Sequence, residues 1–190
     1  MSIVGFSPKV IVAASMTLFL FTSPVKGSNS ATNDDVGALL QELEQGDPVA
    51  SRQAARALEL EWSKSGSASM NLLLNRGEAA LNRSDYRAAV DHLTALTDHA
   101  PHFAEGRALR ARAWHHLDEP GLALSDLQQV LALNPNHFHA LFGLGVTLEQ
   151  LNRPKLALRA YRLVLNIHPQ YEEATEAVSR LTPLVQGESL

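Results

Sequence analysis

The stretch that decides the fold runs from Glu105 to His137, EGRALRARAWHHLDEPGLALSDLQQVLALNPNH, and its pattern returns 34 residues later from His139 to Tyr171 as HALFGLGVTLEQLNRPKLALRAYRLVLNIHPQY. An earlier copy runs from Leu72 to Phe103. Small residues and a closing proline recur in three columns, which are Gly77, Ala111 and Gly145; Ala89, Ala123 and Ala157; and Pro101, Pro135 and Pro169. Self-similarity at a period of roughly 20–50 residues is typical of stacked copies of one supersecondary unit.

Each copy reads as two antiparallel helices. Small side chains let two helices approach closely, so we expect the glycine and alanine columns to meet across each hairpin. Pro120 and Pro154 suit a first helical turn, because the amide that proline lacks has no helical partner there. The closing prolines push the residue before them out of helical geometry and so end the second helix. Apolar residues at helical spacing predict a buried stripe, as at Leu141, Leu144, Leu148 and Leu151.

In period and in these columns, residues 70–171 resemble the tetratricopeptide repeat (TPR) family. The resemblance implies an all-α, right-handed superhelical stack of helix hairpins, with repeats at 70–103, 104–137 and 138–171. It also implies that the first helices line a concave groove for a protein or peptide. The family's groove positions fall here on Asn71, Leu74, Glu78, Glu105, Arg112, His115, His116, His139, Phe142 and Glu149.

Two groove residues stand out as partner contacts. We expect Arg112 to bind a carboxylate and Phe142 to act as an apolar anchor, because Arg and aromatic side chains dominate interface energetics. Some family members grip the terminal carboxylate of chaperone tails with Lys, Asn and Arg. A cytosolic co-chaperone role is not expected here, because the matching positions hold Leu74, Glu78, Leu109, His139 and Gly143.

Arg110 receives a structural interpretation instead. In a common variant of the family, an Arg in this column pairs with an Asp on the partner helix, and Asp126 occupies that place. The resemblance therefore implies an ion pair that locks the second hairpin. Arg107 stands where the family favours a large apolar residue, and its aliphatic stem is expected to pack while its head reaches water.

The N-terminus predicts export. Lys9 precedes twelve mostly apolar residues, 10–21, and a short small-residue stretch, which is typical of a cleaved signal peptide at 1–27. Cleavage is expected after Gly27 or Ser30, and the alternative is a retained anchor at the membrane. Twelve residues are fewer than the roughly 20 that cross a bilayer as a helix. The chain has no cysteine, which excludes a lipoprotein anchor and disulfides. The predicted destination is the bacterial periplasm, or the secretory pathway if the source is not bacterial.

Three further segments flank the repeats. Residues 28–32 are small and polar and predict a flexible leader. Residues 33–69 predict a helical hairpin, either a degenerate repeat or a cover for the end of the stack. Residues 172–190 predict a capping helix and tail, since open repeat arrays need polar outer faces at their ends.

Charge and motifs narrow the function classes. Loss of Lys9 and Lys26 with the signal takes the formal net charge from −4 to −6, so nucleic acid is not an expected partner. The sequence contains no phosphate loop, nucleophile elbow or metal-binding helix motif. Adjacent His115 and His116 point about 100° apart on a helix, so they are poorly placed to share a metal ion. Neither a metal nor a cofactor is therefore predicted. The leading interpretation is a non-catalytic protein- or peptide-binding scaffold of the cell envelope. The alternatives are a chaperone-like accessory factor for exported clients (cytochrome maturation, outer-membrane assembly or division-linked wall synthesis) and, last, a hydrolase.

Overall fold

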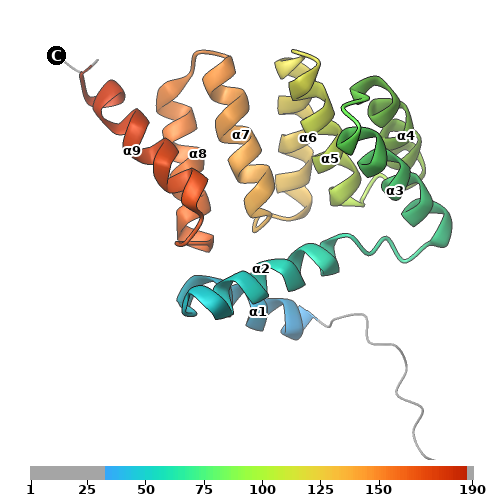
Figure 1. Cartoon of the computed structure of the whole chain (residues 1–190), viewed down its shortest axis with the longest axis horizontal. Helices are drawn as coiled ribbons and strands as arrows, with labels where there is room; N and C mark the ends of the chain where they lie inside the picture. The colour runs from blue at the N-terminus through green and yellow to red at the C-terminus, as the bar shows by residue number, and fades with distance from the viewer. Residues whose placement is uncertain (1–32, 188–190) are drawn as a thin grey trace, which may run out of the picture.

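The computed structural model describes residues 33–187, so the predicted signal peptide, the predicted leader and the last three residues lie outside it. Within that range the chain forms nine α-helices and no strand (Figure 1). The helices are α1 (Asn33–Gln45), α2 (Pro48–Trp62), α3 (Ala68–Asn82), α4 (Tyr86–His99), α5 (Ala104–His116), α6 (Pro120–Leu133), α7 (Phe138–Gln150), α8 (Pro154–Ile167) and α9 (Glu172–Gly187).

The three repeats form the hairpins α3/α4, α5/α6 and α7/α8, which follow one another along a curved stack (Figure 1). The helix boundaries follow the prolines: α6 and α8 begin at Pro120 and Pro154, and each second helix ends shortly before a closing proline. One residue between the two helices of each hairpin adopts positive φ, and these residues, Ser84, Asp118 and Asn152, are again 34 positions apart. Identical turn geometry thus repeats with the sequence. The result is an all-α solenoid.

The small residues allow close packing, but the side chains nearest to Gly77 and Gly145 are not the alanines expected opposite them. A Cβ added to Gly77 would lie 2.6 Å from Leu93 Cγ, and one added to Gly145 would overlap the ring of Tyr161, 2.7 Å from Cδ1. The closest side chains are therefore the large residues one turn beyond Ala89 and Ala157, not those alanines. A glycine on the first helix makes room for a bulky side chain on the second.

The N-terminal hairpin α1/α2 does not cover the open end of the stack before α3. A short segment, 63–67, leads from α2 to α3, and the hairpin folds back to lie across the ends of the later repeats (Figure 1). Its apolar face shares one buried cluster with the third repeat, made of Leu43, Ala54, Ala55 and Leu58 from the hairpin and Phe138, Leu141, Val164 and Ala174 from α7, α8 and α9. The expectation that the hairpin covers the end of the stack is thus wrong, because it packs against the third repeat and α9 instead.

Polar contacts fix the hairpin in this place. The ring of Trp62 stacks on His137 with centroids 4.6 Å apart. The amide of Gln170 donates to the carbonyl of Gly46 over 3.1 Å. Buried Ser51 donates to the carbonyl of Leu43 and lies 3.5 Å from His168 Nδ1. Apart from the bond to Leu43, which lies within the hairpin, these contacts join segments more than 70 residues apart in sequence, so the hairpin is part of one folded unit.

At the other end, α9 packs on α8 through Ala174, Ala177 and Leu181. Arg180 of α9 forms an ion pair with Glu149 of α7 at 2.6 Å, and the Tyr161 hydroxyl donates to the same carboxylate at 2.7 Å. Burial and the bond to Glu149 raise the pKa of Tyr161, so it stays a neutral donor. None of the helices in the described range is both long and apolar enough to cross a membrane.

The expected pair between Arg110 and Asp126 is present. Arg110 Nε and Nη2 donate to the two carboxylate oxygens of Asp126 over 2.8 and 2.7 Å, in a bidentate arrangement. Arg110 Nη1 also donates to the hydroxyls of Thr94 and Thr97 in α4. Arg107 Nη1 lies 3.6 Å from Asp126, so its head joins the network instead of reaching only water. The network ties α4, α5 and α6 together across two repeats.

Candidate functional site

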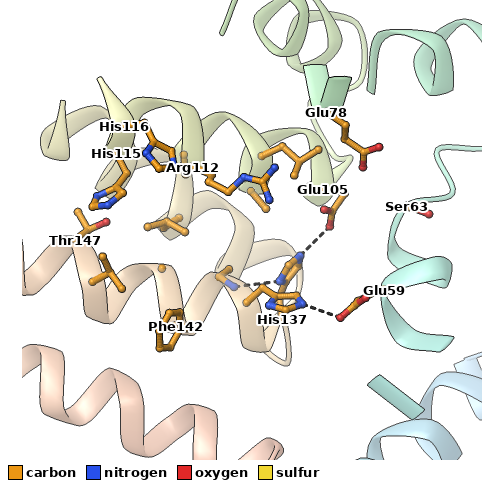
Figure 2. A pocket seen from close by; sticks show the side chains of 18 residues that line it. Glu59, Ser63, Glu78, Glu105, Arg112, His115, His116, His137, Phe142 and Thr147 are labelled. Carbon is orange, nitrogen blue, oxygen red and sulfur yellow. Dashed lines mark hydrogen bonds and ion pairs between the residues drawn. The ribbon is translucent and has the colours of Figure 1, made fainter. Parts of the chain in front are cut away.

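A cavity of about 600 Å³ lies on the side of the stack lined by the first helices of the hairpins. Side chains of α5 and α7 form its two long walls, α3 contributes Glu78, and α2 with its C-cap contributes Glu59 and Ser63 (Figure 2). The hairpin that folds back therefore closes one end of the cavity. The complete lining is Glu59, Ser63, Glu78, Glu105, Ala108, Leu109, Ala111, Arg112, His115, His116, Leu127, His137, His139, Ala140, Phe142, Gly143, Val146 and Thr147.

Seven of the ten predicted groove residues line this cavity: Glu78, Glu105, Arg112, His115, His116, His139 and Phe142. Three do not. Leu74 is only 2% exposed and belongs to the core of the first repeat. Asn71 accepts hydrogen bonds from Ser65 in the linker before α3. Glu149 is held by Tyr161 and Arg180, as described above. The predicted groove residues of the second and third repeats, apart from Glu149, therefore lie around one cavity, whereas Asn71 and Leu74 of the first repeat lie outside it.

Three carboxylates gather at the end closed by α2. Glu59, Glu78 and Glu105 come from three different helices and lie around the same end of the cavity (Figure 2). Burial and the nearby charge of Glu105 raise the pKa of Glu78, and the positive charge of Arg112 acts in the opposite direction. Glu78 has no hydrogen bond or ion pair within residues 33–187. This end of the cavity carries an excess of negative charge.

Two histidines position the other two carboxylates. His137 Nδ1 accepts the backbone amide of Ala140 at the start of α7, so the ring proton is on Nε2, which donates to Glu105 over 3.1 Å. His139 Nε2 lies 2.8 Å from Glu59 of α2, and its Nδ1 lies 3.3 Å from the Tyr171 hydroxyl. His137 is buried and stacks on Trp62, whereas His139 is exposed. The first residues of α7 thus connect the hairpin to the acidic end.

The opposite end of the cavity is occupied by His115 and His116 of α5 (Figure 2). Arg112 of the same helix is exposed, points along the cavity towards Glu105 (Figure 2), and makes no ion pair or hydrogen bond to any residue in the described part of the chain. His115 Nδ1 lies 3.0 Å from Gln150 Oε1, and the ring of His116 stacks on Tyr86 with centroids 4.3 Å apart. Burial lowers the pKa of His116, and the neighbouring His115 and Arg112 lower it further.

Between the two ends the walls are apolar. Phe142, Val146, Ala108 and Leu127 face the cavity from both long sides. Phe142 is half-buried and packs on Tyr161 and Tyr171, so its ring is held in place by the third repeat. No group of three His, Cys, Asp or Glu side chains able to hold a metal ion occurs among residues 33–187. The arrangement suits binding of a chain segment with apolar side chains and polar groups at either end.

Sequence reasoning missed Glu59, Ser63 and His137 as cavity residues. His137 occupies the column of Phe103 and Tyr171 at the end of each repeat, so the pattern marks it as a structural position. Its role at the cavity follows from the docked hairpin, which brings Trp62 onto its ring. Glu59 and Ser63 carry no signal in the sequence, because nothing in the repeat pattern indicates where α2 lies.

Comparison with known proteins agrees with this architecture. A family profile described as tetratricopeptide repeat matches residues 74–127 and 117–172. The chain is 29% identical over 163 residues to a TPR repeat-containing protein of Rhizobium etli, a match that covers 85% of this chain and 80% of that protein.

Solved structures show the same fold. The first TPR domain of Spaghetti (RPAP3) bound to the HSP90 peptide SRMEEVD superposes with a TM-score of 0.62 at 25% identity, over 63% of this chain and 95% of that one. MamA superposes with a TM-score of 0.59 at 19% identity, over 84% of this chain and 86% of that one. The profile matches span just over half of the 190 residues, and the chain belongs to the tetratricopeptide repeat family.

Proposed function

We propose that this protein is a non-catalytic scaffold of the bacterial cell envelope that binds an extended segment of a partner protein in the cavity between α5, α7 and α2. The observation that carries the proposal is the cavity itself: about 600 Å³, apolar along its length, and lined by the helices that line the groove in TPR proteins. A volume of this size holds several side chains of a peptide.

Two side chains are available for such a partner. Arg112 has no ion partner in the described residues, so a carboxylate of the bound segment would gain a charge-assisted hydrogen bond without breaking an existing pair. Phe142 presents a ring that is already fixed by Tyr161 and Tyr171, so little side-chain entropy is lost when an apolar residue packs on it. The peptide complex of the RPAP3 domain supports an extended chain as the occupant.

The charge of the cavity argues against an acidic chaperone tail as this occupant. Several carboxylates in a row would meet Glu59, Glu78 and Glu105 with Arg112 as the sole guanidinium in the lining. Like charges that lose solvent together repel by several kcal/mol, at about the level that decides specificity. We therefore propose a partner segment with few acidic residues, a single carboxylate near Arg112 and an apolar residue near Phe142.

The envelope location rests on the sequence of residues 1–27, which has the order of a signal peptide. A chain that acts after export would meet partners in the periplasm. Cell fractionation of the source bacterium with N-terminal sequencing of the recovered protein tests this part: a cytoplasmic protein that begins at Met1 would contradict it.

The binding proposal is tested by affinity capture from envelope extract with the wild-type chain, Arg112→Glu and Phe142→Ala. The matched control is Arg76→Glu, since Arg76 is exposed on α3 and does not line the cavity. We expect the two cavity variants to lose the captured partner and the control to retain it, with unchanged melting temperatures. Retention of every partner by both cavity variants would refute the cavity as the binding site.

A further inference from the structure

The outer face of α8 combines positive charge with exposed leucines. Its solvent-facing residues are Lys155, Leu156, Arg159, Arg162 and Leu163, whose spacing of three, four and seven places them along one side of the helix. Leu156 is 44% exposed and Leu163 is 50% exposed. The opposite side of α8 is buried in the stack through Ala157, Ala160, Tyr161 and Val164. The face is therefore held rigidly outward.

The neighbouring second helix α6 extends this surface without adding charge. Its exposed residues include Leu122, at 46%, and Leu133, at 39%, with glutamines and a serine between them. Its one acid, Asp126, is buried and bound to Arg110. Neither α6 nor α8 carries an exposed acid, and the exposed carboxylates nearest in sequence are on the loop residue Glu119 and on α9. Arg159 and Arg162 form no ion pair within the described residues.

This local positive charge contrasts with the whole chain, whose formal net charge is −4. Charges farther away than about 10 Å are screened at physiological ionic strength, so an approaching anionic surface responds mainly to the face that it meets. A negative molecule with one basic face would turn that face towards an anionic surface. The cavity lies on the side of the first helices, so it stays open in this orientation.

We propose that the face formed by α8 and α6, with Arg159, Arg162, Leu156 and Leu163 at its centre, docks on an anionic phospholipid bilayer. The guanidinium groups would lie among the lipid phosphates, which accept bidentate hydrogen bonds, and the leucines would enter the boundary between headgroups and acyl chains. Arginine and leucine are residue types by which amphipathic helices bind in the membrane interface. An acidic protein could also pair with the arginines, and it is therefore the alternative occupant that the vesicle test must exclude.

The test measures sedimentation of the full chain with vesicles of phosphatidylglycerol and phosphatidylethanolamine, and with vesicles of phosphatidylcholine alone. The quantity compared is the ratio of the two partition coefficients, because the apolar residues near the N-terminus would bind both kinds of vesicle. Each basic residue near an anionic surface contributes about a fivefold gain in binding, so Arg159→Gln/Arg162→Gln should lower the ratio about 25-fold. Leu156→Ser/Leu163→Ser should lower binding to the anionic vesicles, and added salt should weaken the wild type more than the arginine variant.

The matched control is Arg76→Gln/Arg87→Gln, which removes two exposed arginines from α3 and α4 and should leave the ratio close to the wild-type value. Circular dichroism checks that all variants are folded. The proposal is overturned if the wild type shows no preference for anionic vesicles, which would leave an acidic protein as the partner of this face. It is equally overturned if the control pair lowers the ratio as much as the α8 pair.

Discussion

Replacing Asp126 by alanine tests the most specific structural consequence of the repeat pattern. Asp126 is only 4% exposed, and both of its carboxylate oxygens accept bonds from Arg110. The variant would leave the guanidinium of Arg110, whose side chain is 15% exposed, without a counter-charge between α4 and α6. An arginine guanidinium keeps its proton even without a counter-charge, so Arg110 would remain charged in the variant.

The magnitude follows from this geometry. Removing one member of a buried pair costs about 3–5 kcal/mol. Arg110 keeps some contact with water and two threonine hydroxyls, which places the cost near the lower end, at about 3 kcal/mol. For a chain of this size that corresponds to a fall in melting temperature of about 6–12 °C. Urea unfolding followed by far-UV circular dichroism measures the free energy directly.

The third repeat supplies the decisive control. Its residues in the columns of Arg110 and Asp126 are Leu144 and Ala160, so the fold already accepts an apolar pair there. The double variant Arg110→Leu/Asp126→Ala removes both charges together and should be about 2 kcal/mol more stable than Asp126→Ala alone. The reasoning is refuted if Asp126→Ala unfolds at the wild-type midpoint, or if the double variant is less stable than the single one.

Three further predictions concern packing and pH. Gly145→Ala should destabilise the chain by about 1–3 kcal/mol, because the new methyl group overlaps the ring of Tyr161. Gly121→Ala is the control and should leave stability unchanged, since a Cβ there meets open space. Equal melting temperatures for the two variants would contradict this packing. Trp62→Ala should lower the free energy of unfolding by about 2–4 kcal/mol through loss of its contacts with His137 and Phe138. Limited proteolysis should then cut the 63–67 linker faster than in the control Leu60→Ala, which removes an exposed side chain. Burial and the charge of His139 lower the pKa of His168 from 6.5, against the opposing effect of Glu173 and Glu59, so the unfolded chain binds more protons than the folded one. Stability should therefore fall as pH drops below about 6.5, by at most about 1.4 kcal/mol per pH unit. His168→Asn, which places there the residue found at Asn134 in the second repeat, should flatten this slope in urea titrations at several pH values, and an unchanged slope would show that His168 is not the group responsible.

The repeats could be predicted from sequence because their packing is local and periodic. Columns in the 34-residue pattern correspond to contacts within a hairpin or between neighbours, so Gly145 and Pro154 are recognisable by position, whereas Asp126 is expected from the resemblance to the family. The pattern is less informative about which side chain fills the space beside a glycine. Tyr161 takes that space in the third repeat, and the period alone does not distinguish it from Ala157, one turn away.

The position of α1/α2 could not be predicted, because the contacts that hold it are not periodic. Phe138, Tyr171 and His168 occupy ordinary repeat positions, yet in the third repeat alone they receive the hairpin. Leu43 with Leu39 in α1, and Leu58 with Ala54 in α2, show the spacing of an amphipathic helix, which identifies a buried face without identifying what covers it. The 63–67 segment is rich in serine and contains Gly66 at positive φ. Such a linker allows the hairpin either to cover the end of the stack or to fold back onto the third repeat.

In the binding role proposed above, this fold-back changes which parts of the chain would determine what the cavity binds. In a stack of three repeats without this hairpin, residues of the first helices alone would determine partner specificity. Here Glu59 of α2 faces Glu78 and Glu105 of the repeats at one end of the cavity, and its carboxylate lies 2.8 Å from His139. Substitutions on the exposed side of α2 therefore alter the charge of the site while the repeat columns stay intact. Two chains with identical TPR patterns would consequently select different partners if their N-terminal hairpins differ at this one position.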